Sequence, residues 1–239
     1  MPREQSCHPP SSALRSPIRA VVFDLDGLMF NTEVVFSLAG RELLSRRGKE
    51  WTPSLQSCMM GRRAEEAFQV LIDQTGLTAT IEDLRNESRE IFYDLLPVHL
   101  RPMPGLTELL RGIEELGLPK GVATSSSRRY LEDLLRRFDL LSRFQITLTA
   151  EDVSRGKPDP EIYLLAADRL GIQPDEMLVL EDSGVGTQAA VAAGAVAVSV
   201  PHEHSLSHDF TGAAYIAQGL HDPWIASLLR PARSSGGNP

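Results

Sequence analysis

The chain has 239 residues, of which 42% are hydrophobic and 23% are charged, and its formal net charge is −8 at pH 7. This is the composition of a globular protein large enough for one domain or for a core with a smaller insert. The acidic balance gives no electrostatic reason to bind nucleic acid or an anionic membrane surface, and no apolar run approaches the roughly 20 residues that span a bilayer. We therefore expect neither nucleic acid nor a membrane as a partner.

The two ends of the chain differ in composition from the rest. Residues 1–17 are rich in Pro and Ser and lack the apolar segment of a secretory signal, so we expect a disordered leader, and we expect a disordered tail over 231–239. The two cysteines, Cys7 and Cys58, match no disulfide or metal-binding pattern. These features favour a cytoplasmic protein, and we expect a monomer.

The first predicted element is a strand over residues 19–23, which ends in the acidic pair of Asp24-Leu25-Asp26. From Asn31 to about Pro97, hydrophobic residues recur only at helical spacing, which predicts three or four helices. The first of them is expected over about 33–47, with Asn31 as its cap. We therefore expect a helical unit of residues 31–100 inserted after the first strand of a core formed by 18–30 and 101–230.

From residue 104 onward, predicted strands and helices alternate. The predicted strands lie at 121–124, 146–148, 177–182, 195–200 and 213–217. The helices between them are expected to begin at Pro104, after a Ser127 cap, after an Asp159 cap and at residue 187, and Gly117, Gly171 and Gly194 are expected to end three of them. This alternation predicts an α/β fold with a doubly wound parallel sheet, a Rossmann-like core.

In open parallel sheets, ligands bind beyond the carboxyl ends of the strands, so the residues that follow each predicted strand are site candidates. They are Asp24 and Asp26 after the first strand, Thr124 and Ser125 at the second, Lys157 in the loop RGKPDP beyond the third, and Glu181 and Asp182 at the fourth. These polar residues are far apart in sequence but are predicted to meet at one edge of the sheet. The sequence therefore predicts a functional site there.

Asp24 and Asp26 admit three interpretations. Asp and Gly are common in turns after strands. A calcium loop would need an oxygen-bearing side chain at Leu28, glycine at Met29 and a preceding helix, and none of these is present. The third interpretation is a nucleophile beside an acid–base group, because side chains two apart in an extended segment lie on the same side. A carboxylate of this kind can attack phosphorus and form an aspartyl-phosphate.

Four carboxylates at one sheet edge would repel one another, and a Mg²⁺ ion bound by oxygen ligands would relieve this repulsion. The expected metal ligands are the side chains of Asp24 and Asp182 and the backbone carbonyl of Asp26. Glu181 is expected to be either a further ligand or a support for the ligands. For Glu181-Asp182-Ser183 taken alone, a plain polar turn is the simpler interpretation.

The remaining candidates each have a simple alternative. Thr124 and Ser125 are expected to bind a phosphate oxygen through a hydroxyl, but both could belong to a helix cap. Lys157 is expected to stabilise the transferring phosphoryl group, although most lysines are simply exposed. The alternative for Arg62 and Arg63 is a pair of solvated arginines, and their functional role would be contacts to an anionic or polar part of the substrate.

A histidine-rich segment, HEHSLSH, contains His202, His204 and His208. It lies in a polar stretch without supporting cysteines or a metal-binding spacing. We interpret it as a loop and not as a metal site.

Four segments together resemble the motifs of the haloacid dehalogenase-like hydrolase superfamily: DLDG at 24–27, Thr124-Ser125, Lys157 in GKPDP and EDSGVG at 181–186. They occur in the family's order, and the resemblance covers about residues 18–220. It implies that the helical insert is a cap domain, that Asp24 is the nucleophile and that Asp26 is the general acid and then the base. It further implies that Ser125, with Thr124 nearby, and Lys157 bind the phosphoryl group, while Asp182, with Glu181, holds Mg²⁺.

Within this superfamily the chain looks most like the β-phosphoglucomutase-like branch. Dehalogenases lack an acid at the position of Asp26, so this residue argues for phosphoryl transfer. The mutases of the branch carry a His in the first cap helix and a basic residue three after the cap glycine, where this chain has Phe36 and Ala64. These departures favour a phosphatase. The segment 59–77 also resembles the cap of pseudouridine-5′-phosphatases.

The sequence therefore predicts a Mg²⁺-dependent phosphatase that hydrolyses a small phosphorylated metabolite, either a sugar phosphate or a nucleotide-like monophosphate, through an aspartyl-phosphate. The cap is expected to close over the site by hinging near residues 28–32 and 98–104. Two alternatives remain at this point. One is a phosphomutase of the β-phosphoglucomutase type, and the other is a non-catalytic protein that binds a phosphorylated ligand.

Overall fold

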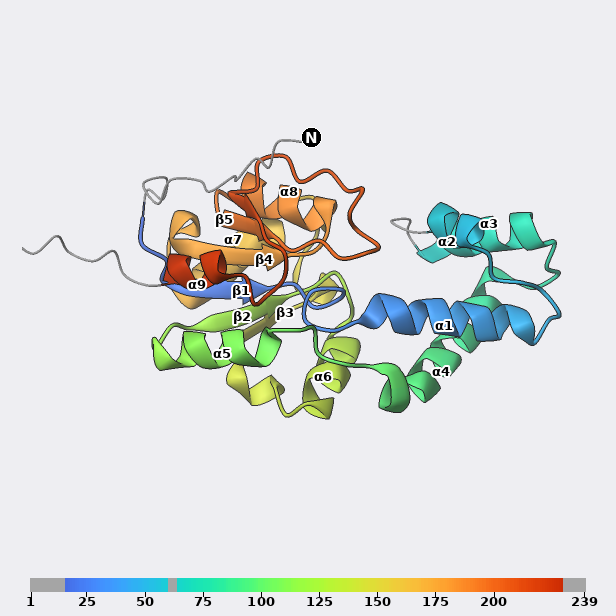
Figure 1. The fold of residues 1–239 in the computed structure, drawn as a ribbon. Coiled ribbons are helices and arrows are strands. Elements are labelled where there is room, and N and C mark those ends of the chain that lie inside the picture. The colour runs from blue at the N-terminus through green and yellow to red at the C-terminus, as the bar shows by residue number, and fades with distance from the viewer. Residues whose placement is uncertain (1–15, 60–63, 230–239) are drawn as a thin grey trace, which may run out of the picture. The chain divides into compact units, whose positions relative to one another are not determined.

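The computed structural model describes residues 16–59 and 64–229 (Figure 1). The chain divides into two compact units, one formed by Met1–Met29 with Pro102–Pro239 and the other by Phe30–Arg101. The predictions made for residues 1–15, for the tail and for Arg62 and Arg63 lie outside the described residues.

The larger unit is built on a six-stranded parallel sheet with the strand order β3-β2-β1-β4-β5-β6. The strands are β1 (Ala20–Phe23), β2 (Lys120–Ala123), β3 (Ile146–Leu148), β4 (Met177–Glu181), β5 (Val196–Ser199) and β6 (Tyr215–Ile216). The central strands β1 and β4 are buried along their whole length, as their uninterrupted apolar runs indicate. The predicted doubly wound parallel sheet is confirmed.

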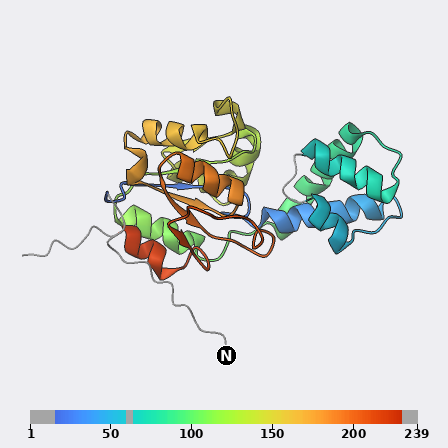
Figure 2. The same cartoon turned by 90° about the horizontal axis from the view of Figure 1, so that it is seen from above.

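Helices cover both faces of this sheet. Figure 1 shows α7 (Glu161–Leu170) and α8 (Gly184–Ala192) on one face, and α5 (Leu106–Glu115) and α6 (Arg128–Arg137) on the other. Figure 2 shows α9 (Pro223–Leu229) on the same side of β1 as α5, against which it packs. Small residues such as Ala166 and Ala189 let α7 and α8 lie close to the sheet, where they form a buried core with Val22 and Val179.

Two helices of this unit, α6 and α8, begin after a serine whose side chain caps them. Ser127 caps α6, as predicted. At α7 the N-cap residue is Pro160, one position later than the predicted Asp159. Helix α8 begins at Gly184, three residues earlier than predicted, because the Ser183 hydroxyl caps it.

The described residues of the smaller unit form helices. These are α1 (Thr32–Ser45), α2 (Pro53–Met59), α3 (Ala64–Thr75) and α4 (Ile81–His99). Helices α1 and α4 pack together through buried residues that include Ala39, Leu43 and Ile91. Asn31 occupies the N-cap position of α1 but makes no capping hydrogen bond, contrary to its predicted role. Its side chain instead donates to the His99 carbonyl at 3.2 Å and accepts from Arg101 N at 2.6 Å, which ties the first residues of the unit to its last.

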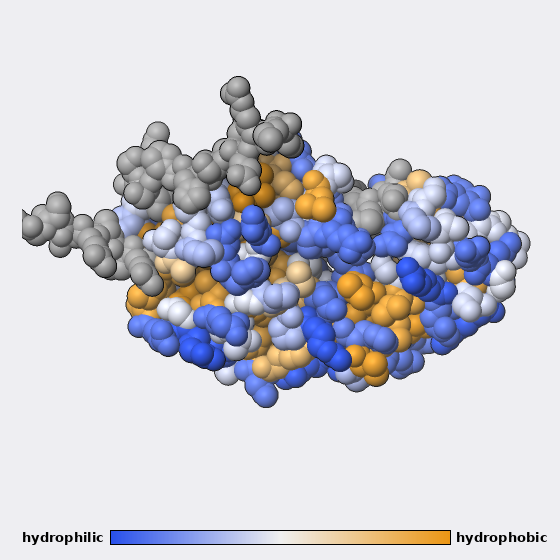
Figure 3. Space-filling view, viewed as in Figure 1, coloured by the Kyte–Doolittle hydropathy of each residue, from blue (hydrophilic) through white to orange (hydrophobic). Residues whose placement is uncertain are grey.

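Polar and apolar residues alternate over the visible surface of each unit (Figure 3). Within the described part of the chain, no helix combines the length and the apolar character that a membrane crossing requires.

Candidate active site

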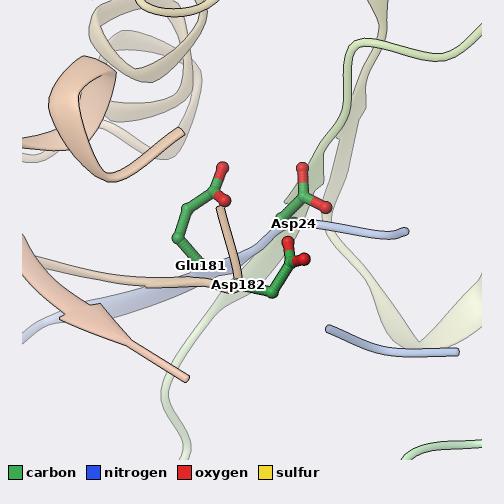
Figure 4. Close-up of side chains that lie close together, drawn as sticks. All are labelled: Asp24, Glu181 and Asp182. Atoms are coloured by element: carbon green, nitrogen blue, oxygen red, sulfur yellow. The ribbon is translucent and has the colours of Figure 1, made fainter. Parts of the chain in front are cut away.

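The site lies where the strand order reverses. β1 and β4 are neighbours in the sheet, but the chain extends from β1 to β2 and β3 on one side and from β4 to β5 and β6 on the other. Such a switch point opens a crevice at the carboxyl ends of the strands. Asp24 directly follows β1, Glu181 is the last residue of β4 and Asp182 follows it. Figure 4 shows these three side chains gathered at this edge.

The three acids form a buried cluster. Asp24 and Asp182 are each 7% exposed and Glu181 is fully buried. One carboxylate oxygen from each lies within 4.8 Å of the others, which is close enough to hold one metal ion. The Nζ of Lys157 lies 2.6 Å from Asp24 Oδ1 and 2.6 Å from Glu181 Oε1. When all four groups are ionised, one ammonium faces three carboxylates, so two negative charges remain within this group.

Burial sets the electrostatics of the cluster. Loss of water raises the pKa of Asp24 well above its ordinary value, and the carboxylates of Glu181 and Asp182 raise it further, while Lys157 opposes the rise. Burial alone would lower the pKa of Lys157, but Asp24 and Glu181 outweigh it and raise that pKa well above its ordinary value. Lys157 is therefore positively charged, and one such charge does not fully compensate Asp24.

A hard divalent cation fits this donor set. The cluster offers only carboxylate oxygens, which Mg²⁺ prefers, and it carries an excess of negative charge that a divalent ion would neutralise. Asp24 and Asp182 stay the predicted side-chain ligands, and both oxygens of Glu181 accept hydrogen bonds from protein groups. The side chain of Asp26 is not part of the acidic cluster found among the described residues. Its backbone carbonyl stays a predicted ligand.

Glu181 accepts hydrogen bonds from several neighbours. Its Oε1 accepts from the Tyr163 hydroxyl at 2.6 Å as well as from Lys157, and its Oε2 accepts from the Ser183 hydroxyl at 2.9 Å. Tyr163 is itself fully buried, and its ring lies 5.0 Å from the Lys157 ammonium. Both roles that the sequence left open for Glu181 stay predictions, because this residue belongs to the acidic cluster and also contacts Lys157.

Gly186 in α8 leaves room for the Glu181 carboxylate. A Cβ atom at this position would overlap the carboxyl group of Glu181, far inside van der Waals contact. We expect Gly186→Ala to destabilise the fold by about 1–3 kcal/mol, because the overpacked carboxylate must move. We also expect this substitution to lower the phosphatase activity that the sequence predicts.

Gly112→Ala is the matched control, because that helical glycine has open space beside it. It should stabilise the fold by about 0.5–1 kcal/mol. Urea unfolding and a phosphatase assay of both variants test this, and an unchanged Gly186→Ala would contradict it.

Asp26 is oriented by two hydroxyl groups. Ser126 Oγ donates to its Oδ2 at 2.8 Å, and the Tyr130 hydroxyl donates to its Oδ1 at 2.7 Å. These two hydrogen bonds fix the direction in which the Asp26 carboxyl group points. The structure thus gives Asp24 and Asp26 different surroundings.

Thr124 and Ser125 also differ from each other in burial and in hydrogen bonding. Thr124 follows β2, is 1% exposed, and its Oγ1 accepts from Ser126 N at 3.0 Å, which shapes the turn. Ser125 is exposed, and its hydroxyl has no hydrogen-bond partner among the residues that the structure describes. Ser125 is therefore the better placed of the two to bind a ligand.

One histidine of the HEHSLSH segment reaches the site. His202 Nε2 lies 2.9 Å from Asp182 Oδ2. Residues 202–208 lie between β5 and β6, with turns over 203–207, which agrees with the interpretation of this segment as a loop. The sequence did not identify His202 as a site residue, although one signal was available: β5 lies next to β4, so the residues after β5 reach the same edge.

Tyr163, Ser126 and Tyr130 are also site residues that sequence reasoning missed. Tyr163 has the helical spacing of a core residue and Tyr130 that of a packed helix face, so nothing in the sequence separates them from ordinary packing. Ser126 lies in the serine run 125–127, and the sequence does not show which of these hydroxyls faces which carboxylate.

A buried acidic cluster paired with a lysine at the switch point of a parallel sheet is suited to bind a metal ion and an anionic group. The chain belongs to the haloacid dehalogenase-like hydrolase family, whose model matches residues 21–200. The predicted family and fold are thus confirmed.

Individual relatives agree with this assignment. The chain is 33% identical over 181 residues to a phosphorylated carbohydrates phosphatase of Thermotoga maritima, and the match covers 74% of this chain and 82% of that protein. It is 30% identical over 207 residues to a candidate pseudouridine-5′-phosphatase of Drosophila melanogaster, with 84% and 89% covered. A crystal structure of a candidate β-phosphoglucomutase from Thermotoga maritima superimposes with a TM-score of 0.77 at 30% identity, over 89% of this chain and 97% of that one. These matches bear out the predicted branch and the predicted class of enzyme, a phosphoric monoester hydrolase.

Proposed function

We propose that the protein is a Mg²⁺-dependent phosphatase that hydrolyses a small phosphorylated metabolite through an aspartyl-phosphate on Asp24. The observation that carries this proposal is the contact of Asp24 with buried Lys157 inside a cluster of three acids at the switch point. A bound Mg²⁺ would neutralise negative charge on the substrate and on the cluster. The relatives named for phosphatase activity on carbohydrates and on a nucleoside phosphate support this reaction.

The proposed reaction has two steps. In the first, a carboxylate oxygen of Asp24 bonds to phosphorus, the bond from phosphorus to the leaving oxygen breaks, and Asp26 gives that oxygen its proton. In the second, Asp26 takes a proton from water, whose oxygen bonds to phosphorus and releases inorganic phosphate from Asp24. Ser125 would hold an oxygen of the phosphoryl group, and Lys157 would offset the negative charge on Asp24 throughout.

We propose that the unit Phe30–Arg101 is the cap of this enzyme. The chain enters and leaves it at adjacent points, since Asn31 N donates to Arg101 O at 3.1 Å and Arg101 N donates to the Asn31 side chain. Two adjacent linkers near residues 28–32 and 98–104 would form a hinge. Arg62 and Arg63 stay the predicted contacts for the part of the substrate that distinguishes one metabolite from another.

Phosphate release by the purified chain should depend on Mg²⁺. We expect one or more members of a panel of sugar phosphates and nucleoside monophosphates, with pseudouridine 5′-phosphate included, to be hydrolysed in the presence of Mg²⁺. Chelation by EDTA should lower the rate by about 100-fold or more, because the charges of the cluster and the phosphate are no longer neutralised, and excess Mg²⁺ should restore it. Malachite-green detection of phosphate measures this.

Three results would decide against the proposal. Conversion of one sugar phosphate into its isomer without phosphate release would show a phosphomutase. Retention of full activity in EDTA would exclude the role of the metal. Binding without turnover across the whole panel would favour a non-catalytic protein, although the chain keeps both Asp24 and Asp26.

A further inference from the structure

The loop that follows β5 contains a histidine for which the proposed reaction has no role. His202 comes three residues after the end of β5, and its Nε2 lies 2.9 Å from Oδ2 of Asp182. Asp182 is one of the two predicted side-chain ligands of Mg²⁺. The Asp182 carboxylate thus belongs to the acidic cluster and also contacts an imidazole.

The backbone of the same loop determines which ring nitrogen of His202 carries the proton. The backbone N–H of His204 donates to His202 Nδ1 at 3.2 Å, so Nδ1 accepts. In a neutral imidazole the other nitrogen then carries the hydrogen. Nε2 therefore donates to Asp182 Oδ2.

The backbone of the loop is held in place at His202. The backbone N–H of His202 donates to the Ser205 hydroxyl at 3.0 Å, and Ser205 N donates back to the His202 carbonyl at 2.8 Å, with Ser205 only 1% exposed. Next to the hydrogen bond between His202 and Asp182 lies Gly27, where a Cβ atom would come within 2.6 Å of His202 Nε2 and 2.5 Å of Asp182 Oδ2. The absence of a side chain at Gly27 therefore makes room for this hydrogen bond.

We propose that His202 is a positioning residue for the metal site: its Nε2–H holds Oδ2 of Asp182 and thereby presents the other carboxylate oxygen, Oδ1, to Mg²⁺. This inference rests on the Mg²⁺ site of the proposed function. Mg²⁺ demands near-ideal octahedral geometry, so a carboxylate fixed in one orientation binds it better than one that rotates. Partners that orient metal ligands typically contribute 10–100-fold to metal affinity.

Two substitutions of His202 separate the donor from the bulk of the side chain. Glutamine can place an N–H near the position of Nε2, whereas the shorter asparagine places its amide near Nδ1. We expect His202→Asn to weaken Mg²⁺ binding about 10–100-fold and His202→Gln to keep it within a few-fold of the wild type. His204→Ala is the control for the loop, because it removes the ring that lies edge-on to His202 at 5.7 Å between centroids and leaves in place the backbone N–H that donates to Nδ1.

Calorimetric titration of the full chain with Mg²⁺ and without substrate measures these affinities, and the melting temperature of each metal-free variant reports on folding. A loss confined to His202→Asn, at an unchanged metal-free melting temperature, supports the proposal. Equal Mg²⁺ affinity in His202→Asn and the wild type overturns it and leaves the phosphatase intact. Equal losses in the asparagine, glutamine and His204→Ala variants also overturn it, since they show a general effect of the loop. A wild-type chain that binds no Mg²⁺ removes both this inference and the metal site on which it rests.

Discussion

Asp24→Asn should reduce phosphatase turnover by about four orders of magnitude or more, the scale of loss when an enzyme's nucleophile is removed. An amide has nearly the shape of a carboxylate but does not attack phosphorus, so no aspartyl-phosphate forms. The fold should persist, because Lys157 keeps Glu181 as a partner at 2.6 Å and the substitution removes one of three crowded negative charges. Initial rates on the best substrate of the panel measure the loss. Brief incubation with a ³²P-labelled substrate should label the wild type and not the variant.

Asp168→Asn is the matched control for this experiment. Asp168 is an exposed residue of α7 in the same unit, and the substitution removes the same charge away from the site. It should leave turnover within about two-fold of the wild type, since surface substitutions of this kind change little. Turnover above a tenth of the wild-type rate in Asp24→Asn, with a folded protein confirmed by its melting temperature, would refute the assignment of the nucleophile.

The alternation of strands and helices in the sequence was sufficient to predict the parallel sheet and the edge at which the candidate site lies. Strands such as β1 and β4 are continuous apolar runs because they are covered on both faces, and this makes them visible in the sequence. Each is followed at once by carboxylates, which a buried strand end does not need for folding. Because the carboxyl ends of parallel strands lie at one edge of a sheet, the convergence of Asp24 and Asp182 could be predicted before any coordinates, whereas the strand order was not predicted.

Helix boundaries were less predictable, because several residues nearby can serve as the cap. In the segment before α7, both Asp159 and Pro160 suit the start of a helix, and the chain uses Pro160 as N-cap while Asp159 accepts from Glu161 N. Helix α9 was not predicted. It has only seven residues and is stabilised by packing on α5, which a local pattern does not reveal.

The division of labour within the site could not be read from the sequence. Asp24 and Asp26 lie two residues apart. Asp24 nevertheless contacts Lys157, whereas Asp26 contacts Ser126 and Tyr130. Glu181 and Asp182 are adjacent, yet Glu181 contacts Lys157 while Asp182 contacts His202. These differences come from side-chain directions at the strand ends and from residues that lie 20 to 133 positions away in the chain. Only the folded chain brings such partners together.

Lys157→Met should have the second largest effect. The Nζ of Lys157 lies 2.6 Å from Asp24 Oδ1, 2.6 Å from Glu181 Oε1 and 3.0 Å from the Ala123 carbonyl oxygen. The three N–H donors of the ammonium are therefore all used by the protein. Methionine has a similar length and no charge. It would leave two buried carboxylates without their cation, which typically destabilises a fold by about 3–5 kcal/mol. Loss of the positive charge beside the nucleophile should also lower kcat by roughly 10²–10³-fold. Urea unfolding and initial rates measure the two effects.

The double variant Lys157→Met with Glu181→Gln separates stability from catalysis. Removing the charge of Glu181 along with that of Lys157 leaves one carboxylate, Asp24, without its cation in place of two, and the amide can still bond to Tyr163 and Ser183. Because the two residues are in contact, their effects should not add, and the double variant should regain about half or more of the lost stability. Its activity should stay as low as that of Lys157→Met, since the charge beside Asp24 is still missing. Activity that returns together with stability would mean that Lys157 serves only the fold, and the proposed electrostatic role of this residue would then be wrong.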